Sequence, residues 1–204
     1  MIKIINYGSG NIRAIGNIYD RLSIPYEIIE TIEGLKDASK IILPGVGAFD
    51  ECMDKLNKSG FVKPLEEKVL EKKIPVLGIC VGMQILAEGS EEGELPGLGW
   101  VQGNVKLIDK SLLLQKPKLP HLGWNSISIK KETTLLKGVN EEEGFYFIHS
   151  YYFECKNEED VLATTFYGKS FTSAVNKENV FGVQFHPEKS HHNGTTLLKN
   201  FAEL

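Results

Sequence analysis

The sequence predicts an α/β fold in which helices flank an open, mainly parallel sheet and antiparallel strands are added in the C-terminal half. Three observations support this prediction. Short β-branched runs alternate with longer amphipathic segments through the first hundred residues, as in βαβ units. Apolar runs such as KIIL and PVLGI lack polar alternation, which is typical of strands covered on both faces. From about Gly97, strand-like runs follow one another with mainly turns between them.

The first half contains the elements of a parallel core. β-branched and apolar runs predict strands at residues 2–6, 25–29, 40–47 (with a closing turn) and 74–79. Helical spacing of apolar residues predicts helices at 11–22, 61–73 and 83–88. Because ligand sites in open α/β sheets gather at the carboxyl ends of the strands, we expect the site near the YGSGN, PGVG and CVG loops.

The second half is predicted to add antiparallel strands and a final helix. The strand-like segments are GWVQGNVKLI, GWNSISIK, FYFIHSYYFEC, VLATTFYG and NVFGVQF, at residues 99–108, 123–130, 145–155, 161–168 and 179–185. The segment TTLLKNFAEL predicts a helix over 195–204. The sequence has neither a repeat nor a linker, so we expect one domain over residues 1–204.

Composition excludes several function classes. The 204 residues are 42% hydrophobic and 25% charged, which suits one globular domain with a full core. The net charge of −4 and the scattered lysines provide no basic surface for nucleic acid. No apolar run approaches the roughly 20 residues of a membrane helix, and the N-terminus lacks the apolar region of a signal peptide. We therefore expect a cytoplasmic protein that binds neither nucleic acid nor membrane.

A lone cysteine lies where a strand should enter a helix. Cys80 stands in GICVG, with Gly78 and Gly82 on either side, which is the form of a nucleophile elbow with cysteine in place of serine. Such a turn exposes the sulfur, and the partial positive charge at the following helix N-terminus favours thiolate. The alternative is a small buried apolar residue. Cys52 and Cys155 form no CxxC with Cys80, so neither a disulfide framework nor a thiolate zinc site is predicted.

The segment FHPE offers the base that a cysteine nucleophile needs. His186 ends an apolar strand, and Pro187 favours extended geometry for it. In extended chain Glu188 would project to the same side as His186 and could fix its tautomer while the other ring nitrogen serves Cys80. A chance acidic neighbour is the alternative for HPE alone, but its predicted position at the same sheet edge as GICVG favours a catalytic triad.

An oxyanion hole should accompany a nucleophile that attacks a carbonyl group. The backbone N–H of Val81, just after the nucleophile, is one natural donor. The PGVG loop, residues 44–47, follows a strand of the same layer, and its glycines allow a peptide to turn its N–H towards the site. A plain strand-to-helix turn is the alternative for PGVG.

Two other sequence patterns do not indicate a binding site. His191 and His192 are adjacent, so their side chains diverge, and no ligand spacing of a known zinc site surrounds them; no metal is expected. The segment YGSGNIR, with Glu30 downstream, imitates a dinucleotide fingerprint. Arg13 takes the place of its third glycine, where close helix packing tolerates no side chain, so we reject that interpretation.

The motifs GICVGMQ, ILPGVGAF and FHPEKS together resemble the class I glutamine amidotransferases, the Cys-His-Glu triad family. The stretches NYGSGNIRAI, SEEGELPGLGWVQGNV, LPHLGWN and FYFIHSYY are similar, within that family, to the glutaminase subunits of imidazole glycerol phosphate synthases. The resemblance runs in order from residue 2 to the C-terminus. It implies a flavodoxin-like sheet and hydrolysis of L-glutamine without a cofactor.

The resemblance also implies roles for individual residues. Cys80 would attack the glutamine side-chain amide, His186 would pass the proton to ammonia, and Glu188 would orient His186. Water would then hydrolyse the glutamyl thioester. Gly47 matches the oxyanion loop, whose rearrangement in this family is thought to couple glutaminase activity to the partner.

Further positions match the family's glutamine pocket: Gln84, Glu92, Ser150 and Tyr151. An anion at Glu92 would suit the α-ammonium group of the substrate. A solvated acidic loop is the alternative for Glu92, and ordinary strand residues are the alternative for Ser150 and Tyr151.

A partner is implied as well, because the sequence has no Walker-type loop and no second half to bind an ammonia acceptor. In the family resembled, a (βα)8-barrel cyclase receives the ammonia through a tunnel. It makes imidazole glycerol phosphate and AICAR from phosphoribulosyl-formimino-AICAR-phosphate (PRFAR). We expect a heterodimer docked at the triad edge, with interface candidates at Asn11, Arg13, Trp124, Asn125 and Lys189.

Three rival functions remain open. The same glutaminase chemistry could serve a paralogous synthase that amidates, for example, a surface sugar; the SHHNG segment after FHPEK leaves this open. A catalytically silent regulatory module is disfavoured by the complete Cys-His-Glu set. A stand-alone cysteine hydrolase is disfavoured because HPE has no counterpart there and the glutamate of that group usually precedes the cysteine.

Overall fold

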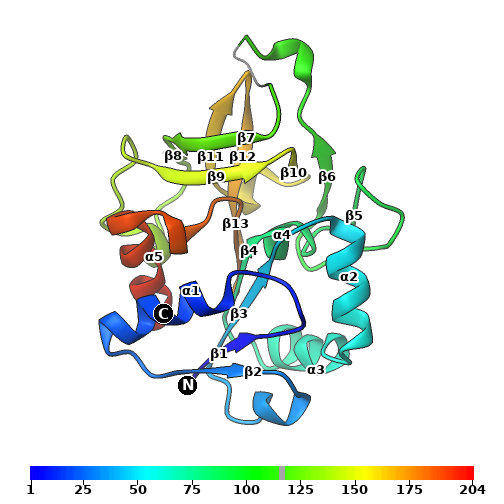
Figure 1. Cartoon of the computed structure of the whole chain (residues 1–204), viewed down its shortest axis with the longest axis vertical. Helices are drawn as coiled ribbons and strands as arrows, with labels where there is room; N and C mark the ends of the chain where they lie inside the picture. Colours follow the sequence, from blue (N-terminus) through cyan, green and yellow to red (C-terminus); the bar gives the residue numbers. More distant parts are fainter. Residues whose placement is uncertain (115–117) are drawn as a thin grey trace.

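The computed structural model describes residues 1–114 and 118–204. Within these residues eleven strands form one sheet, whose main path has the order β2-β1-β3-β4-β13-β12-β10-β6-β5, with β11 and β8 joined alongside β12 (Figure 1). A separate two-stranded ribbon consists of β7 (His121–Asn125) and β9 (Phe145–His149). The predicted α/β class is confirmed.

The parallel part of the sheet contains the predicted first-half strands. They are β1 (Ile2–Ile5), β2 (Tyr26–Ile29), β3 (Lys40–Gly45) and β4 (Val76–Cys80), and β13 (Val180–Val183) from the far end of the chain pairs in parallel with β4. The residues of β1, β4 and β13 are buried throughout, as continuous apolar runs predict. The pairing of β13 with β4 places two segments a hundred residues apart side by side.

Helices cover both faces of the parallel part. α1 (Ile12–Leu22) and α5 (His191–Glu203) contact each other, and α2 (Phe49–Lys58) and α3 (Val62–Glu66) lie across the sheet from them in Figure 1. A π-helical turn, Glu67–Glu71, continues α3, as the prediction for 61–73 requires. Helix α2 was not predicted, and α5 begins four residues before the expected helix.

The second half adds antiparallel strands, as predicted. They are β6 (Gly103–Leu107), β8 (Ser128–Ile129), β10 (Tyr151–Cys155), β11 (Val161–Tyr167) and β12 (Lys169–Lys177), with β5 (Gly89–Ser90) parallel to β6. β12 was missed because SFTSAVNK lacks clear alternation. The expected single strand 145–155 breaks at Ser150 into β9 and β10, which belong to different sheets.

The helix expected over 83–88 is much shorter than predicted. α4 covers only Val81–Gln84. The following carbonyls of Ile85, Leu86 and Ala87 accept hydrogen bonds from a later loop, from the N–H groups of Leu98, Val101 and Gly99 respectively. Since these carbonyls are satisfied across the loop, the fourth-neighbour pattern of an α-helix stops after one turn.

No helix among the described residues is both long and apolar enough to cross a bilayer.

Candidate active site

The carboxyl ends of β3 and β4, the β1–α1 loop and the segment after β13 enclose one pocket of about 410 Å³. Eight of the nine site residues expected from the sequence line it, and Glu188 stands behind His186. The lining is Asn11, Val46, Gly47, Cys80, Val81, Gln84, Glu92, Pro120, Ile148, His149, Ser150, Tyr151, His186 and Lys189. Residues from seven separate segments therefore meet at the edge where open α/β sheets bind ligands.

Cys80 sits on a strained turn between β4 and α4. Its φ is +57° and its ψ is −114°, a conformation that residues with a Cβ rarely adopt. The flanking glycines are sterically required: a Cβ on Gly82 would lie 1.9 Å from the carbonyl oxygen of Leu43, and one on Gly78 would lie 2.5 Å from that of Gly82. The turn can pack this close to β3 only without those side chains.

His186, Glu188 and Asn11 form a hydrogen-bonded series behind the cysteine. The Nδ1 atom of His186 lies 2.8 Å from Oε1 of Glu188, and the side-chain amide of Asn11 donates to the same oxygen at 2.8 Å. Both the histidine and the glutamate side chains are almost fully buried. Within the described residues, Nε2 of His186 is buried without a hydrogen-bond partner, so it is free to exchange a proton with the nucleophile or the leaving group.

The route by which Glu188 reaches His186 differs from the expected one. Residues Pro187–Lys189 form a 3₁₀ turn instead of continuing the strand. The glutamate therefore folds back to the imidazole through the turn, while His186 itself is extended, as its proline neighbour predicts.

The charged forms of His186 and Glu188 stabilise each other because the two side chains lie in contact. Desolvation acts to lower the pKa of His186, but Cys80 and Glu188 outweigh it and raise that pKa to about 10. Burial acts to raise the pKa of Glu188, and the hydrogen bond and charge of His186, with the Asn11 amide, hold it below its usual value. The geometry thus favours an imidazolium held between the carboxylate of Glu188 and the sulfur of Cys80.

The residues expected to bind the substrate differ in which of their polar atoms remain available for a hydrogen bond with a ligand. The Nε2 group of Gln84 donates to the carbonyl of Tyr151 at 3.1 Å and to Oε1 of Gln184 at 3.0 Å, so only its amide oxygen can accept from a ligand. Glu92 accepts from the backbone N–H of Phe49 at 2.9 Å through Oε2. It thereby caps α2 while its carboxylate lines the pocket. Ser150 sits at the break between β9 and β10.

The PGVG loop is held from behind by a serine and a buried cysteine. The N–H of Val46 donates to Oγ of Ser9 at 2.9 Å, and the carbonyl of Val46 accepts from Oγ of Ser9 at 2.9 Å and from Sγ of Cys52 at 3.3 Å. Gly47, at φ +97°, has a conformation that favours glycine. The N–H of Val46 therefore does not point at the pocket in this structure, whereas Val81 follows the nucleophile as expected.

Three residues of the site were not given catalytic or substrate roles from the sequence. Asn11 was expected only at the interface, and Gln184 and His149 were assigned nothing. The sequence indicates a role for them only weakly: Gln184 lies two residues before His186, and His149 directly precedes Ser150. Their partners are distant in sequence, so only the folded chain shows what they contact.

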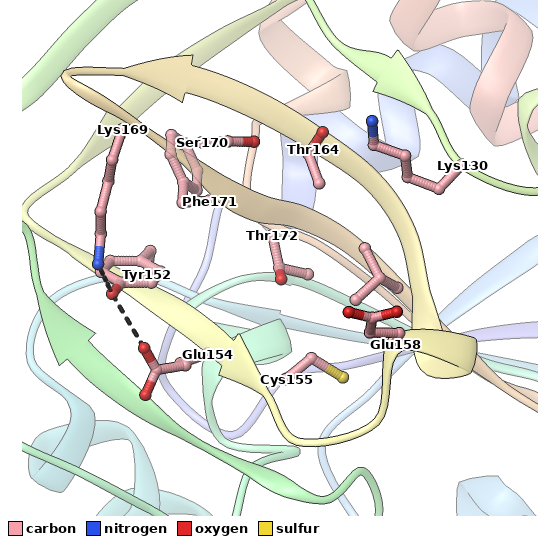
Figure 2. Close-up of a pocket in the computed structure, with 11 residues that line it drawn as sticks. Lys130, Tyr152, Glu154, Cys155, Glu158, Thr164, Lys169, Ser170, Phe171 and Thr172 are labelled. Atoms are coloured by element: carbon pink, nitrogen blue, oxygen red, sulfur yellow. Dashed lines mark hydrogen bonds between the residues drawn. The ribbon is translucent and has the colours of Figure 1, made fainter.

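A second cavity, of about 510 Å³, lies over β10, β11 and β12 (Figure 2). Cys155 lines it, but no histidine does, and burial raises the pKa of the Cys155 thiol. Lys169, which could have served as a base, is hydrogen-bonded to the hydroxyl of Tyr152 and lies over its ring. This cavity therefore lacks an activated nucleophile.

Known proteins resemble this chain over nearly its whole length. The family model for glutamine amidotransferase class-I matches residues 5–204. The chain is similar to imidazole glycerol phosphate synthase subunit HisH of Leptospira borgpetersenii (50% identity) and of Bdellovibrio bacteriovorus (53%), in each case over all of both chains. It is 47% identical, over the same full span, to a Pseudomonas aeruginosa protein named subunit HisH 2.

Solved structures share the fold at lower identity. A crystal structure described as a glutamine amidotransferase superposes with a TM-score of 0.74 at 20% identity, covering 99% of this chain and 97% of the other. PurLQS from Thermotoga maritima gives a TM-score of 0.74 at 17% identity, with the same coverage. The resemblance expected from the sequence is confirmed: the chain belongs to the class-I glutamine amidotransferases and, among them, to the family of the HisH subunits of imidazole glycerol phosphate synthase.

Proposed function

We propose that this chain is the glutaminase subunit of an imidazole glycerol phosphate synthase, and that residues 1–204 act as one amidotransferase domain in the cytoplasm. It hydrolyses L-glutamine to glutamate and ammonia and passes the ammonia to a (βα)8-barrel cyclase of the histidine pathway. The observation that carries this proposal is the meeting of Cys80, His186 and Glu188 at one pocket, with the cysteine on a strained elbow.

The proposed reaction has two halves. The Cys80 thiolate attacks the side-chain carbonyl carbon of glutamine, and the imidazolium of His186 gives its Nε2 proton to the departing amine, which leaves as ammonia. Water, deprotonated by the now neutral His186, attacks the resulting thioester. The C–S bond breaks, the thiolate reforms and glutamate leaves. Glu188 holds the imidazole in the required tautomer throughout.

The pocket supplies contacts for both ends of the substrate. The Glu92 carboxylate lines the wall that would face the α-ammonium group, and the free amide oxygen of Gln84 can accept a hydrogen bond from the substrate. The backbone N–H of Val81 is a donor for the oxyanion. Gly47 and Ser150 line the remaining wall.

The conformation of the PGVG loop leads us to expect that glutaminase activity depends on the cyclase partner. The Val46 N–H is bound to Ser9, so it can serve as a second oxyanion donor only if this peptide turns. Substrate-loaded cyclase docking at the same edge would provide the energy for that change. We therefore expect the isolated chain to be nearly idle.

The docking face is proposed to be the rim of the pocket. The outer side of the β7–β9 ribbon exposes Leu122 (54%), Trp124 (47%) and Ile148 (40%), and Ile148 also lines the pocket. Exposed apolar residues of this size beside a catalytic pocket favour a protein partner. Asn11 and Lys189 lie at the same rim.

The deciding experiment measures glutamate release from glutamine by the chain alone and with the cyclase subunit of the same organism plus PRFAR. Strong stimulation that Cys80→Ala abolishes would support both the triad and the histidine-pathway assignment. Turnover that survives Cys80→Ala would overturn the triad.

The same experiment also tests whether the ammonia goes to a different acceptor. The numbered name of the Pseudomonas relative indicates more than one such subunit in that organism. If the cyclase gives no stimulation, while a glutamine-analogue electrophile still alkylates Cys80 in folded protein, the glutaminase serves another synthase, such as one that amidates a surface sugar.

A further inference from the structure

Gln184 contacts the nucleophile directly. Its side chain is fully buried, and Nε2 lies 3.8 Å from Sγ of Cys80, within reach of a hydrogen bond to sulfur. Among the described residues this sulfur is the sole hydrogen-bond partner of that amide nitrogen. Because a buried amide without a partner is costly, the contact with sulfur is the one that satisfies Gln184.

The direction of the Gln184 amide is fixed by Gln84. The Nε2 group of Gln84 points one hydrogen at the carbonyl of Tyr151 and the other at Oε1 of Gln184. An amide oxygen cannot donate, so Gln184 must turn its oxygen to Gln84 and its N–H groups towards Cys80.

A histidine pair supports this arrangement from the ribbon. Nδ1 of His149 lies 2.7 Å from the same Tyr151 carbonyl and must donate to it, which leaves Nε2 as an acceptor for Nδ1 of His121 at 2.9 Å. Nε2 of His121 then accepts from the side-chain amide of Asn125 at 3.1 Å. Burial lowers the pKa of both histidines, to about 3 for His149 and about 4 for His121, so both rings are neutral and each tautomer is determined.

We propose that Gln184 is a catalytic residue whose amide N–H stabilises the Cys80 thiolate, and that Gln84 and His149 are positioning residues that hold this amide in place. The inference rests on the proposed function in taking Cys80 as the nucleophile. Because α4 has only four residues, its macrodipole is small, and a specific donor at the sulfur adds to the stabilisation that His186 provides.

The test follows the ionisation of Cys80 through its reactivity. The full chain is alkylated with iodoacetamide between pH 5 and 10, and modification is quantified on the Cys80 peptide by mass spectrometry. Gln184→Met keeps the volume but removes the donor, and should raise the midpoint of the rate–pH curve by about one pH unit. Gln184→Glu should raise it further, because a second anion would face the sulfur. Gln102→Met, at an exposed glutamine, is the matched control and should leave the midpoint unchanged.

Unchanged midpoints in folded Gln184→Met and Gln184→Glu would overturn the proposal. If circular dichroism shows that both are unfolded, Gln84→Met takes their place, because it removes the group that orients Gln184. An upward shift then supports the proposal and no shift overturns it. The assay needs no glutamine, so its failure is separate from that of the proposed function: absent turnover with a shifted midpoint contradicts only the glutaminase assignment, and normal turnover with an unshifted midpoint contradicts only the role of Gln184.

Discussion

At the residue scale, the site is a set of groups whose charges depend on one another. His186 lies between Cys80 and Glu188, and Asn11 completes the coordination of the glutamate oxygen. A buried carboxylate is tolerated here because two hydrogen-bond donors, His186 and Asn11, and the positive charge of the imidazolium compensate its desolvation. Removing any member should therefore change how the others ionise.

The glutamate is expected to act through the imidazole. Glu188→Gln keeps the shape but removes the charge that fixes the tautomer, so stimulated glutaminase activity should fall about 100- to 10,000-fold. Steady-state kinetics with the cyclase present measures this, and the KM for glutamine should change little because Glu188 does not line the pocket. Activity equal to wild type would contradict the orienting role.

The protonation of His186 gives a prediction with a definite sign. Its pKa is raised from 6.5 in the folded protein, to about 10. The stabilisation from the ion pair is therefore fully present below about pH 6.5 and is lost as the pH rises towards 10. Nitrogen-15 NMR should show the imidazolium still present at pH 8, and Cys80→Ala should lower the midpoint. A midpoint near 6.5 in the wild type would refute the pair.

At the element scale, the elbow depends on how closely α4 approaches β3. Gly82 leaves no room for a side chain, since its Cβ would meet the Leu43 carbonyl at 1.9 Å. Backbone cannot move aside as a flexible side chain can, so the whole turn would have to shift.

Gly82→Ala should therefore destabilise the fold by about 3 kcal/mol or more and abolish activity. Gly89→Ala is the matched control, because its Cβ would meet only the Asn104 amide oxygen at 3.4 Å. Urea denaturation measures the difference. Equal unfolding midpoints for the two variants would show that the turn can relax.

The β7–β9 ribbon should be sensitive to acid. The folded pKa values of His121 and His149 are about 4 and about 3, below the ordinary 6.5, so the unfolded chain binds more protons in between. Their contribution to the free energy of unfolding is present above about pH 6.5 and declines by about 1.4 kcal/mol per pH unit for each histidine as the pH falls. Urea midpoints from pH 7 to 4 test this, and His121→Phe should reduce the slope; an unchanged slope would contradict it.

At the scale of the whole molecule, the apolar rim and the catalytic pocket belong to one face. Leu122 and Trp124 are exposed on the ribbon, and Trp124 stacks on His191 from the segment after the triad (ring centroids 5.2 Å apart). The SHHNG segment therefore contributes His191 to the proposed docking face.

A charge on this rim should weaken the complex. Leu122→Glu is expected to reduce the affinity for the cyclase at least 10-fold by placing an unpaired charge in the interface. Leu70→Glu, at a similarly exposed leucine (40%) on the π-helical turn, is the control. Isothermal titration calorimetry measures both, and the alkylation rate of Cys80 should be the same in both variants. Equal affinities would place the interface elsewhere.

The sequence by itself determined the parallel core and the antiparallel addition, and it predicted the residues that we propose to react. Strand and helix periodicity is local, so β1 to β4, α1 and most of the later strands could be predicted from short windows. The glycines around Cys80 and the HPE triplet are likewise local patterns whose chemistry follows from neighbouring residues.

The tertiary structure alone decided what depends on contacts between distant segments. α4 ends after one turn because carbonyls beyond it bind the 97–101 loop, and the strand at 145–155 divides because its halves pair with different partners. Asn11 meets Glu188 across 177 positions, and Gln184 meets Cys80 across 104. Short windows of sequence cannot contain such pairs. The residues proposed to affect the ionisation of Cys80 can therefore be identified only from the folded chain, in which packing brings the strand ends together.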